Sequence, residues 1–157
     1  MKEIKIRKAT IDDLPTILTL NNKLFKYEMD RDLDNYIPNW AFGKESTEYF
    51  SDLIENQFVI IAEIDNNPIG YLAGSVYLDD TYSYYEGKTA DLDNMYIEEE
   101  YRHFGIGSKL VNSFFEWCRE KQAQRIFVTA TLGNDNTISF YKKHGFKELN
   151  IELKKEL

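Results

Sequence analysis

The chain has 157 residues, a formal net charge of −8 at pH 7, and one cysteine, Cys118. This length suits a single domain with a core of its own, and the negative charge argues against nucleic acid, whose phosphates need a basic surface. One cysteine allows no disulfide within the chain, no apolar run is long enough to span a membrane, and the N-terminus lacks a signal-peptide core. We therefore expect a cytoplasmic protein with no membrane partner.

The first half of the chain predicts a strand, two helices and a hairpin. Ile4 and Ile6 alternate with charged neighbours as in a strand, and Thr10 to Asp13 has the pattern of a capping box. Pro15 must lie near the start of the next helix, because an interior proline would break it. That helix reaches at least to Phe25. A second helix is expected over 46–55, followed by strands over 58–64 and 69–77 that the turn 65–68 joins as a hairpin.

The second half predicts alternating strands and helices. The expected elements are a strand over 90–97, a helix over 105–122, a strand over 125–131, a short helix over 135–143 that ends at Gly145, and a final strand over 146–153. No repeat, low-complexity tract or linker interrupts this order. It indicates an α/β fold with a sheet of mixed strand direction, in one domain over residues 1–157.

A glycine-bearing turn stands between the strand over 90–97 and the helix that follows. A helix N-terminus leaves backbone N–H groups unpaired at the positive end of the helix dipole, which suits phosphate. Gly105 and Gly107 would let the backbone approach an anion closely, and Arg102 adds a positive charge. The turn is neither the dinucleotide-binding fingerprint, whose third glycine it lacks, nor a P-loop, because no Gly-Lys-Ser/Thr follows.

Two motifs together resemble the GCN5-related N-acetyltransferase (GNAT) superfamily. Its pyrophosphate turn, Arg/Gln-x-x-Gly-x-Gly/Ala, is matched by Arg102, Gly105 and Gly107. Its later motif, Asn-x-x-Ala-x-x-x-Tyr-x-x-x-Gly-Phe, is matched in every place except that of alanine, where Thr137 stands; the matching residues are Asn134, Tyr141, Gly145 and Phe146. The resemblance implies a mostly antiparallel twisted sheet flanked by helices, whose fourth and fifth strands separate to admit the pantetheine arm of acetyl-CoA.

The resemblance also implies a set of residues for acetyl-CoA. The pantetheine arm would pair with a strand edge at Met95, Tyr96 and Ile97, where a backbone N–H near Tyr96 would stabilise the oxyanion. Asn134 would bond the pantetheine amides, or act as a helix N-cap, or do both. The pyrophosphate would lie on the turn formed by Arg102, His103, Phe104, Gly105, Ile106, Gly107 and Ser108.

Acetyl transfer to an amine needs a proton acceptor and a proton donor. An alkyl amine with a pKa near ~10.4 is neutral in about one molecule in 2,500 at pH 7, a cost of roughly 4.6 kcal/mol. Asp91 and Asp93, on one strand face by alternation, could take this proton directly or through water, although solvent-facing aspartates fit the pattern equally well. By resemblance, Tyr141 would donate a proton to the departing CoA thiolate.

The sequence leaves the acceptor amine open. Acidic and aromatic residues interleave in the segments around 27–36 and 79–86, which favours a cationic amine such as a polyamine, an aminoglycoside-like compound or a lysine-type amine. The candidate substrate residues are Glu28, Asp30, Tyr82 and Asp93. His103 and His144 are poor candidates for a base, two histidines make a metal site improbable, and we expect Cys118 in the core.

These observations predict an acetyl-CoA-dependent N-acetyltransferase that acts by direct attack in a ternary complex. The alternatives are an acetyl-CoA-binding sensor without turnover, an acetyltransferase for protein N-termini, and a nucleotide-phosphate binder unrelated to CoA. Homodimers are common in the resembled family, but the sequence marks no interface.

Overall fold

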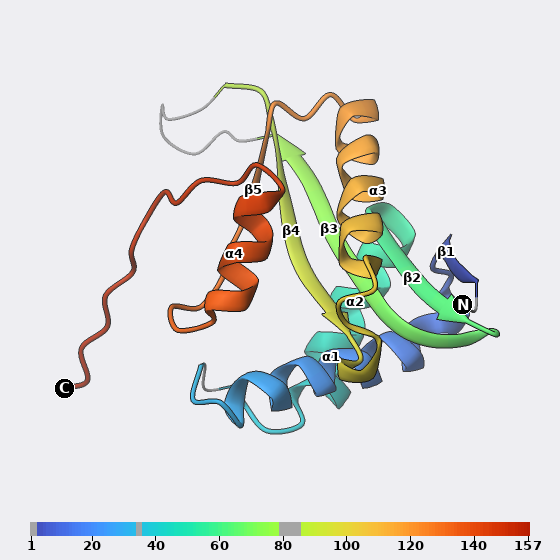
Figure 1. Ribbon diagram of the computed structural model, residues 1–157, viewed down its shortest axis with the longest axis horizontal. Helices are drawn as coiled ribbons and strands as arrows, with labels where there is room; N and C mark the ends of the chain where they lie inside the picture. Colours follow the sequence, from blue (N-terminus) through green and yellow to red (C-terminus); the bar gives the residue numbers. More distant parts are fainter. Residues whose placement is uncertain (1–2, 34–35, 79–85) are drawn as a thin grey trace.

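The computed structural model describes residues 3–33, 36–78 and 86–157. Figure 1 shows the chain as a twisted sheet with helices packed against it and a C-terminal segment that leaves the body. The strands and α-helices are β1 (Ile4–Lys8), α1 (Leu14–Met29), α2 (Lys44–Asn56), β2 (Phe58–Ile64), β3 (Asn67–Leu78), β4 (Lys88–Ile97), α3 (Ile106–Glu120), β5 (Arg125–Val128) and α4 (Asp135–Lys143).

The strands form one sheet in the order β1-β2-β3-β4-β5. The first four strands pair antiparallel, and β5 pairs parallel with β4. This confirms the expected mixed, mostly antiparallel sheet. A parallel pair needs a crossover connection, and α3 supplies it between β4 and β5.

The two faces of the sheet carry two separate hydrophobic cores. One core packs α3 against the sheet around Leu110, Phe114 and Leu72, and includes Cys118, which is 2% exposed as expected. The other core packs α1 and α2 against the opposite face around Ile17, Phe50 and Tyr71. The interior strand β2 supplies residues to both cores, which explains its nearly continuous apolar sequence.

The hairpin turn and the helix start that the sequence predicts are both present in the structure. Asp65 and Asn66 both have positive φ angles, 52° and 63°, and connect Ile64 to its partner Asn67 in a two-residue hairpin turn. The Thr10 backbone N–H donates to the Asp13 carboxylate at 2.8 Å, and Pro15 lies in the first turn of α1. The predicted helices and strands differ from the observed ones mainly at their ends.

The final predicted strand is the exception. Residues 146–153 form no strand in the part of the chain that the structure describes, and Ile151 and Leu153 are 73% and 90% exposed. The residues do alternate, but a strand is stable only when a neighbouring strand pairs with its N–H and C=O groups, and none of the described strands does so.

Among the described residues, we find no helix that combines the length and the apolar character needed to cross a bilayer.

Candidate active site

The site begins where β4 and β5 separate. The two strands pair only from Thr89 to Leu92 on β4, so the rest of β4, residues 93–97, has no partner from β5. On its other side this part of β4 still pairs with β3. Within the described residues, the second half of β4 is therefore an open edge at the centre of the sheet, with α4 alongside it (Figure 1). This is the strand separation that the resemblance implies, and it suits an extended amide-rich ligand.

A β-bulge interrupts β4 at Asp93. Ala73 of β3 is opposite Asn94, and Gly74 is opposite Leu92, so Asp93 is an extra residue without a counterpart. The bulge reverses the alternation of side chains along the strand. Leu92 packs in the core under α3, whereas Tyr96, four residues later, packs in the core under α1 and α2. Bulges bend a strand and redirect a side chain, and are frequent next to active sites.

Asp91, Asp93 and Tyr49 of α2 form one electrostatic group. Partial burial of the Asp93 carboxyl and the charge of Asp91 raise the pKa of Asp93 to about 6, against a hydrogen bond from Ser75 that lowers it. Burial and both aspartates raise the pKa of Tyr49, so the phenol stays protonated. The two carboxylates lie near each other, as the sequence predicts. Their relative position, however, follows from the bulge and not from regular alternation along the strand.

Amide side chains hold this part of β4 against α1 and α2. Asn94 donates to the Tyr49 hydroxyl at 3.2 Å, and Asn21 donates to Asn94 at 3.3 Å and to the Tyr71 hydroxyl at 3.0 Å. Asn21 is fully buried, and its Oδ1 has no partner among the described residues. This network fixes the strand next to the bulge, and its Asn21–Tyr71 bond is buried and therefore costly to break.

The turn before α3 has the features of an anion site. Gly105 is the N-cap in a left-handed conformation with φ of 78°, and His103 also has a positive φ of 68°. A Cβ at Gly107 would lie 3.1 Å from Phe140 of α4 and 3.4 Å from Ile97, so glycine permits the close approach of these elements. Ile106 is buried, and Phe104 is 58% exposed. The first backbone N–H groups of α3 remain available to an anion, as in other helix N-termini.

The side chains of Arg102 and Ser108 connect this turn to its surroundings. Arg102 donates to the Ile97 carbonyl at 2.8 Å, and its guanidinium lies 4.3 Å from the ring centre of Tyr27. The expected positive charge is present, but this side chain also fixes the end of β4. The Ser108 hydroxyl lies 3.1 Å from the His144 Nε2, which joins the turn to the end of α4. His144 therefore has a structural contact that the sequence did not indicate.

Tyr141 lies on α4 and belongs to the same buried cluster as Ile106 and Leu110 of α3. Its side chain is 7% exposed, and burial together with the charge of Glu28 raises the pKa of its hydroxyl. Among the described residues, that hydroxyl donates no hydrogen bond. Asn134 accepts from the Thr137 backbone N–H at 3.4 Å, so its N-cap role is observed. A protonated phenol beside an open strand edge has the properties of a proton donor.

The candidate substrate residues divide into three groups. Asp93 lies in the site. Glu28 accepts a hydrogen bond from the Tyr36 hydroxyl at 2.6 Å, and its charge contributes to the raised pKa of Tyr141. Asp30 follows α1 on the exposed surface, and no contact among the described residues links it to these carboxylates. Tyr82 and most of its acidic, aromatic segment lie outside the described residues.

Sequence reasoning missed Tyr49, Ser75 and Asn94. None of them belongs to a motif, and each enters the site through strand pairing or helix packing. Met95 and Ile97 are half-buried on the α3 face, as their β4 positions require after the bulge.

Comparison with known proteins gives consistent results. The model of the acetyltransferase (GNAT) family matches residues 23–146. An uncharacterized N-acetyltransferase of Methanocaldococcus jannaschii is 25% identical over 96% of this chain, which spans 64% of that protein's length. An N-alpha-acetyltransferase of Sulfurisphaera tokodaii is 26% identical, with 96% of this chain and 84% of the relative covered. A spermidine N(1)-acetyltransferase of Thermoplasma acidophilum is also 26% identical, over 92% of this chain and 88% of the relative.

A solved structure supports the same fold. A protein of Clostridium acetobutylicum described as a predicted acetyltransferase, whose structure was determined with acetyl-CoA, has a TM-score of 0.78 and 24% identity, with 98% of this chain and 96% of that chain covered. The family match spans most of the sequence and includes β4, the turn before α3 and Tyr141. The chain belongs to the acetyltransferase (GNAT) family.

Proposed function

We propose that this protein transfers the acetyl group of acetyl-CoA to a cationic primary amine, with Asp93 as the proton acceptor and Tyr141 as the proton donor. One observation carries the proposal: β4 has an open edge at residues 93–97, the pKa of Asp93 on that segment is raised to about 6, and the phenol of Tyr141 on α4 is buried with a raised pKa. The two groups have the protonation states that attack and departure require at neutral pH.

Acetyl-CoA would bind along the open edge. Its pyrophosphate suits the backbone N–H groups of the turn from Arg102 to Ser108, and its pantetheine amides suit the strand edge at residues 95–97. Family membership and the structure of the Clostridium acetobutylicum relative with acetyl-CoA support this co-substrate. The thioester would then lie near the bulge, where a backbone N–H of β4 can stabilise the negative oxygen of the intermediate.

The reaction would proceed by direct attack. The neutral amine nitrogen forms a bond to the thioester carbonyl carbon, and Asp93 accepts the proton that the nitrogen loses. The C–S bond then breaks, and the sulfur leaves as a thiolate that takes the proton of the Tyr141 hydroxyl. Cys118 is excluded as a nucleophile for a covalent intermediate, since it lies in the core and burial raises the pKa of its thiol to about 12.

The chemistry around Asp93 favours a cationic acceptor. Asp91, Asp93 and Glu28 supply negative charge, while Tyr49 and Trp40 belong to a row of ring contacts that runs from Tyr36 to Tyr71. Carboxylates and aromatic faces together bind ammonium groups. The spermidine acetyltransferase relative fits this class, whereas the N-alpha-acetyltransferase relative makes a protein N-terminus the second candidate.

The test is thiol release from acetyl-CoA with a panel of polyamines, aminoglycosides, lysine peptides, N-terminal peptides and simple amines. We expect thiol release with at least one class of amine that carries two or more positive charges. Monoamines of equal length, whose remaining chain is uncharged, should give weak release. Release confined to N-terminal peptides would replace the small cationic acceptor by a protein. If no amine in the panel causes thiol release while acetyl-CoA still raises the melting temperature, a sensor without turnover is favoured. Stabilisation by ATP or NAD and not by acetyl-CoA would overturn the cofactor assignment.

A further inference from the structure

A chain of hydrogen bonds connects the buried side of α1 to the residue next to Asp93. Asn21 donates from Nδ2 to the Asn94 Oδ1 at 3.3 Å, and Asn94 donates from its own Nδ2 to the Tyr49 hydroxyl at 3.2 Å. The Asn21 Nδ2 also donates to the Tyr71 hydroxyl at 3.0 Å. Asn94 is the residue that follows Asp93 at the bulge, so the chain reaches α2 immediately beside the proposed proton acceptor.

This chain of hydrogen bonds has a preferred direction, which follows from the amide of Asn21. Asn21 is fully buried, and its Oδ1 has no partner among the described residues. If both amides were turned over, the Asn21 Nδ2 would take that position with two unpaired N–H groups. Buried donors without a partner are rarer in proteins than oxygens with an unused lone pair, so the reversed direction is disfavoured. Asn94 therefore presents its N–H to Tyr49 and not its oxygen.

This direction leaves Tyr49 with one hydrogen to donate. The hydroxyl oxygen accepts from Asn94, and the hydroxyl donates to no group in the part of the chain that the structure describes. Burial and the charges of Asp93 and Asp91 raise the pKa of the phenol, so this hydrogen is retained. The charged form of an acceptor amine has no lone pair and cannot take the hydrogen, whereas a carboxylate oxygen can. The Tyr49 hydroxyl is thus a donor that suits a nearby carboxylate.

The groups that act on the Asp93 carboxyl come from three elements. Asp91 is on the same strand, Ser75 is on β3 and Tyr49 is on α2, while the charge of Glu28 on α1 acts on two other tyrosines. Tyr49 is 36% exposed and Asp93 also reaches solvent, so a water molecule can bridge the two where a direct bond would be too long. Tyr49 is therefore placed to donate to this carboxyl.

We propose that Tyr49 is a positioning residue for Asp93: its hydroxyl donates to the Asp93 carboxylate, directly or through one water, in a direction set by Asn94 and Asn21. A hydrogen bond to the charged carboxylate opposes burial and the charge of Asp91, which both favour the neutral acid. Tyr49 would thereby keep Asp93 ionised and oriented toward the acceptor amine at neutral pH. The inference rests on the proposed function only in that Asp93 is the proton acceptor.

The first test measures the Asp93 carboxyl itself. NMR titration of isotope-labelled aspartate carboxyls, with the Asp93 signal identified by its absence in Asp93→Asn, gives the pKa without any need for turnover. In Tyr49→Phe we expect this pKa to rise from about 6 to about 7, because the lost hydrogen bond stabilised the charged form. An unchanged pKa of Asp93 in Tyr49→Phe would overturn the proposal.

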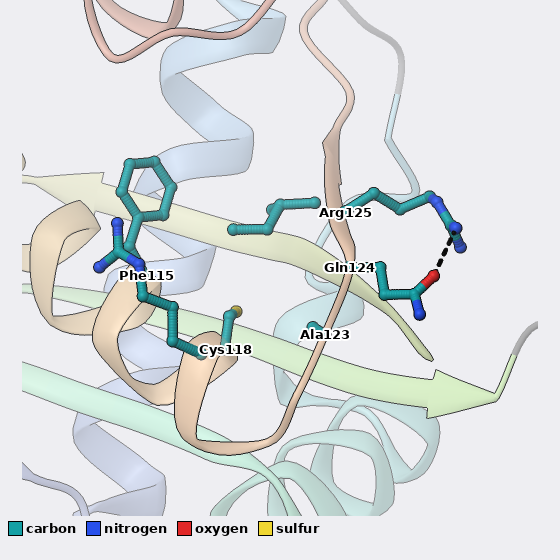
Figure 2. A pocket seen from close by; sticks show the side chains of 7 residues that line it. Phe115, Cys118, Ala123, Gln124 and Arg125 are labelled. Atoms are coloured by element: carbon teal, nitrogen blue, oxygen red, sulfur yellow. Dashed lines mark hydrogen bonds between the residues drawn. The ribbon is translucent and has the colours of Figure 1, made fainter. Parts of the chain in front are cut away.

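Two control variants separate this contact from a general loss of stability. Tyr71→Phe removes a hydroxyl from the same network but not from the branch that leads to Asp93. Cys118→Ala truncates a buried side chain that lines a cavity of about 280 Å³ between α3 and β5 (Figure 2), in the hydrophobic core on the other face of the sheet. Both variants should lower the melting temperature and leave the pKa of Asp93 at about 6. A rise of that pKa in the controls as large as in Tyr49→Phe would contradict the role of Tyr49.

A double variant tests whether Asn94 acts through Tyr49. Asn94→Leu keeps the size of the side chain but lets the Tyr49 hydroxyl turn, so we expect a smaller rise in the pKa of Asp93 than Tyr49→Phe gives. In Tyr49→Phe/Asn94→Leu the rise should equal that of Tyr49→Phe alone, because the two residues act along one path. A further rise caused by Asn94→Leu in the phenylalanine variant would show that Asn94 acts independently, contrary to the proposed chain of hydrogen bonds.

Kinetics then distinguish this inference from the proposed function. If Asp93 is the proton acceptor, the inflection of kcat/KM in Tyr49→Phe should move to higher pH together with the pKa of the carboxyl. Above the inflection, the rate should approach that of the unchanged chain. A carboxyl pKa that rises while the inflection stays in place would overturn Asp93 as the base and leave the contact between Tyr49 and Asp93 established.

Discussion

At the scale of single residues, the surroundings of Asp93 and Tyr141 set opposite protonation states. Asp93 sits at a bulge, where partial burial and, to a smaller extent, the charge of Asp91 raise its pKa to about 6. Tyr141 is buried and keeps its proton. Neither property belongs to the residue type, since an aspartate ordinarily titrates near pH 4 and a tyrosine near pH 10. Local packing supplies the difference, and the following two predictions depend on it.

Tyr141→Phe removes the proposed donor and little else. We expect kcat to fall about 10²- to 10³-fold, because the thiolate then departs without a positioned proton. The affinity for acetyl-CoA and the melting temperature should change little, since the hydroxyl makes no hydrogen bond among the described residues. Thiol release and a thermal shift with CoA measure these effects. Unchanged turnover would assign the proton transfer to water.

Asp93→Asn tests the base through its pH dependence. Since the pKa of Asp93 is about 6, kcat/KM of the unchanged protein should fall as the pH drops through 6, when the carboxylate becomes protonated. The variant should be slower and should lack this inflection. Because the folded-state pKa lies above the ordinary value of 3.8, the charged form is disfavoured by folding at neutral pH, and this penalty is absent below pH 4.

The melting temperature of Asp93→Asn at pH 7 should therefore equal or exceed that of the unchanged chain. Asp91→Asn is the companion variant. If Asp91→Asn removes the inflection and Asp93→Asn retains it, Asp91 is the base.

At the scale of elements, the turn before α3 combines conformational freedom with close packing. Gly105 needs glycine for its positive φ, while Gly107 needs it because Phe140 lies so close. The sequence motif shows the two glycines but does not distinguish their reasons. Packing of α4 against α3 supplies the second reason, and it joins the turn to the helix that carries Tyr141.

Gly105→Ala should weaken acetyl-CoA binding. The substitution forces a left-handed backbone on alanine, at a cost of about 1 kcal/mol, and disturbs the N–H groups that would face the pyrophosphate. Gly145→Ala is the matched control, because Gly145 also has a positive φ, of 90°, and space around its Cβ, but lies after α4. Titration with CoA, together with melting temperatures, is the measurement. We expect similar loss of stability in both variants and a clear loss of CoA affinity only for Gly105→Ala.

At the scale of the whole molecule, one ion cluster joins the edge of the sheet to the start of α1. Arg7 of β1 pairs with Asp13 at 2.7 Å and with Glu63 of β2 at 2.7 Å. The Glu63 side chain is only 7% exposed, so Arg7 is the cation that neutralises a buried carboxylate. Arg7 lowers the pKa of Asp13 to about 2.

Arg7→Met should lower the free energy of unfolding by about 3 kcal/mol at pH 7, because Glu63 would be left buried without its cation. Since the pKa of Asp13 is lowered, the stability from its pair is present above about pH 4 and is lost as the pH falls toward 2. Lys44→Met is the control, because the Lys44–Glu48 pair is exposed and should contribute less than about 0.5 kcal/mol. Denaturant unfolding measures both; equal effects would show that burial of Glu63 does not matter.

Most of the helices and strands, and the family, can be predicted from the sequence alone. Apolar periodicity predicted each helix and the first five strands, because burial of one face imposes its period on the residues. The hairpin at Asp65 and Asn66, the start of α1 and the turn before α3 were visible because their backbone conformations demand particular residues. Two motifs then indicated the acetyltransferase family that the comparison confirms.

The assembly of the site and the conformation of the C-terminal segment depend on long-range contacts that the sequence does not reveal. The bulge at Asp93 depends on the register of two strands, and Tyr49, Ser75 and Asn94 meet it through pairing and packing between distant segments. The alternation in residues 149–153 predicted a strand but could not show whether a neighbour exists. A local sequence pattern shows which face of a segment is apolar. The segment that pairs with it, and the pKa values that burial produces, follow from long-range contacts.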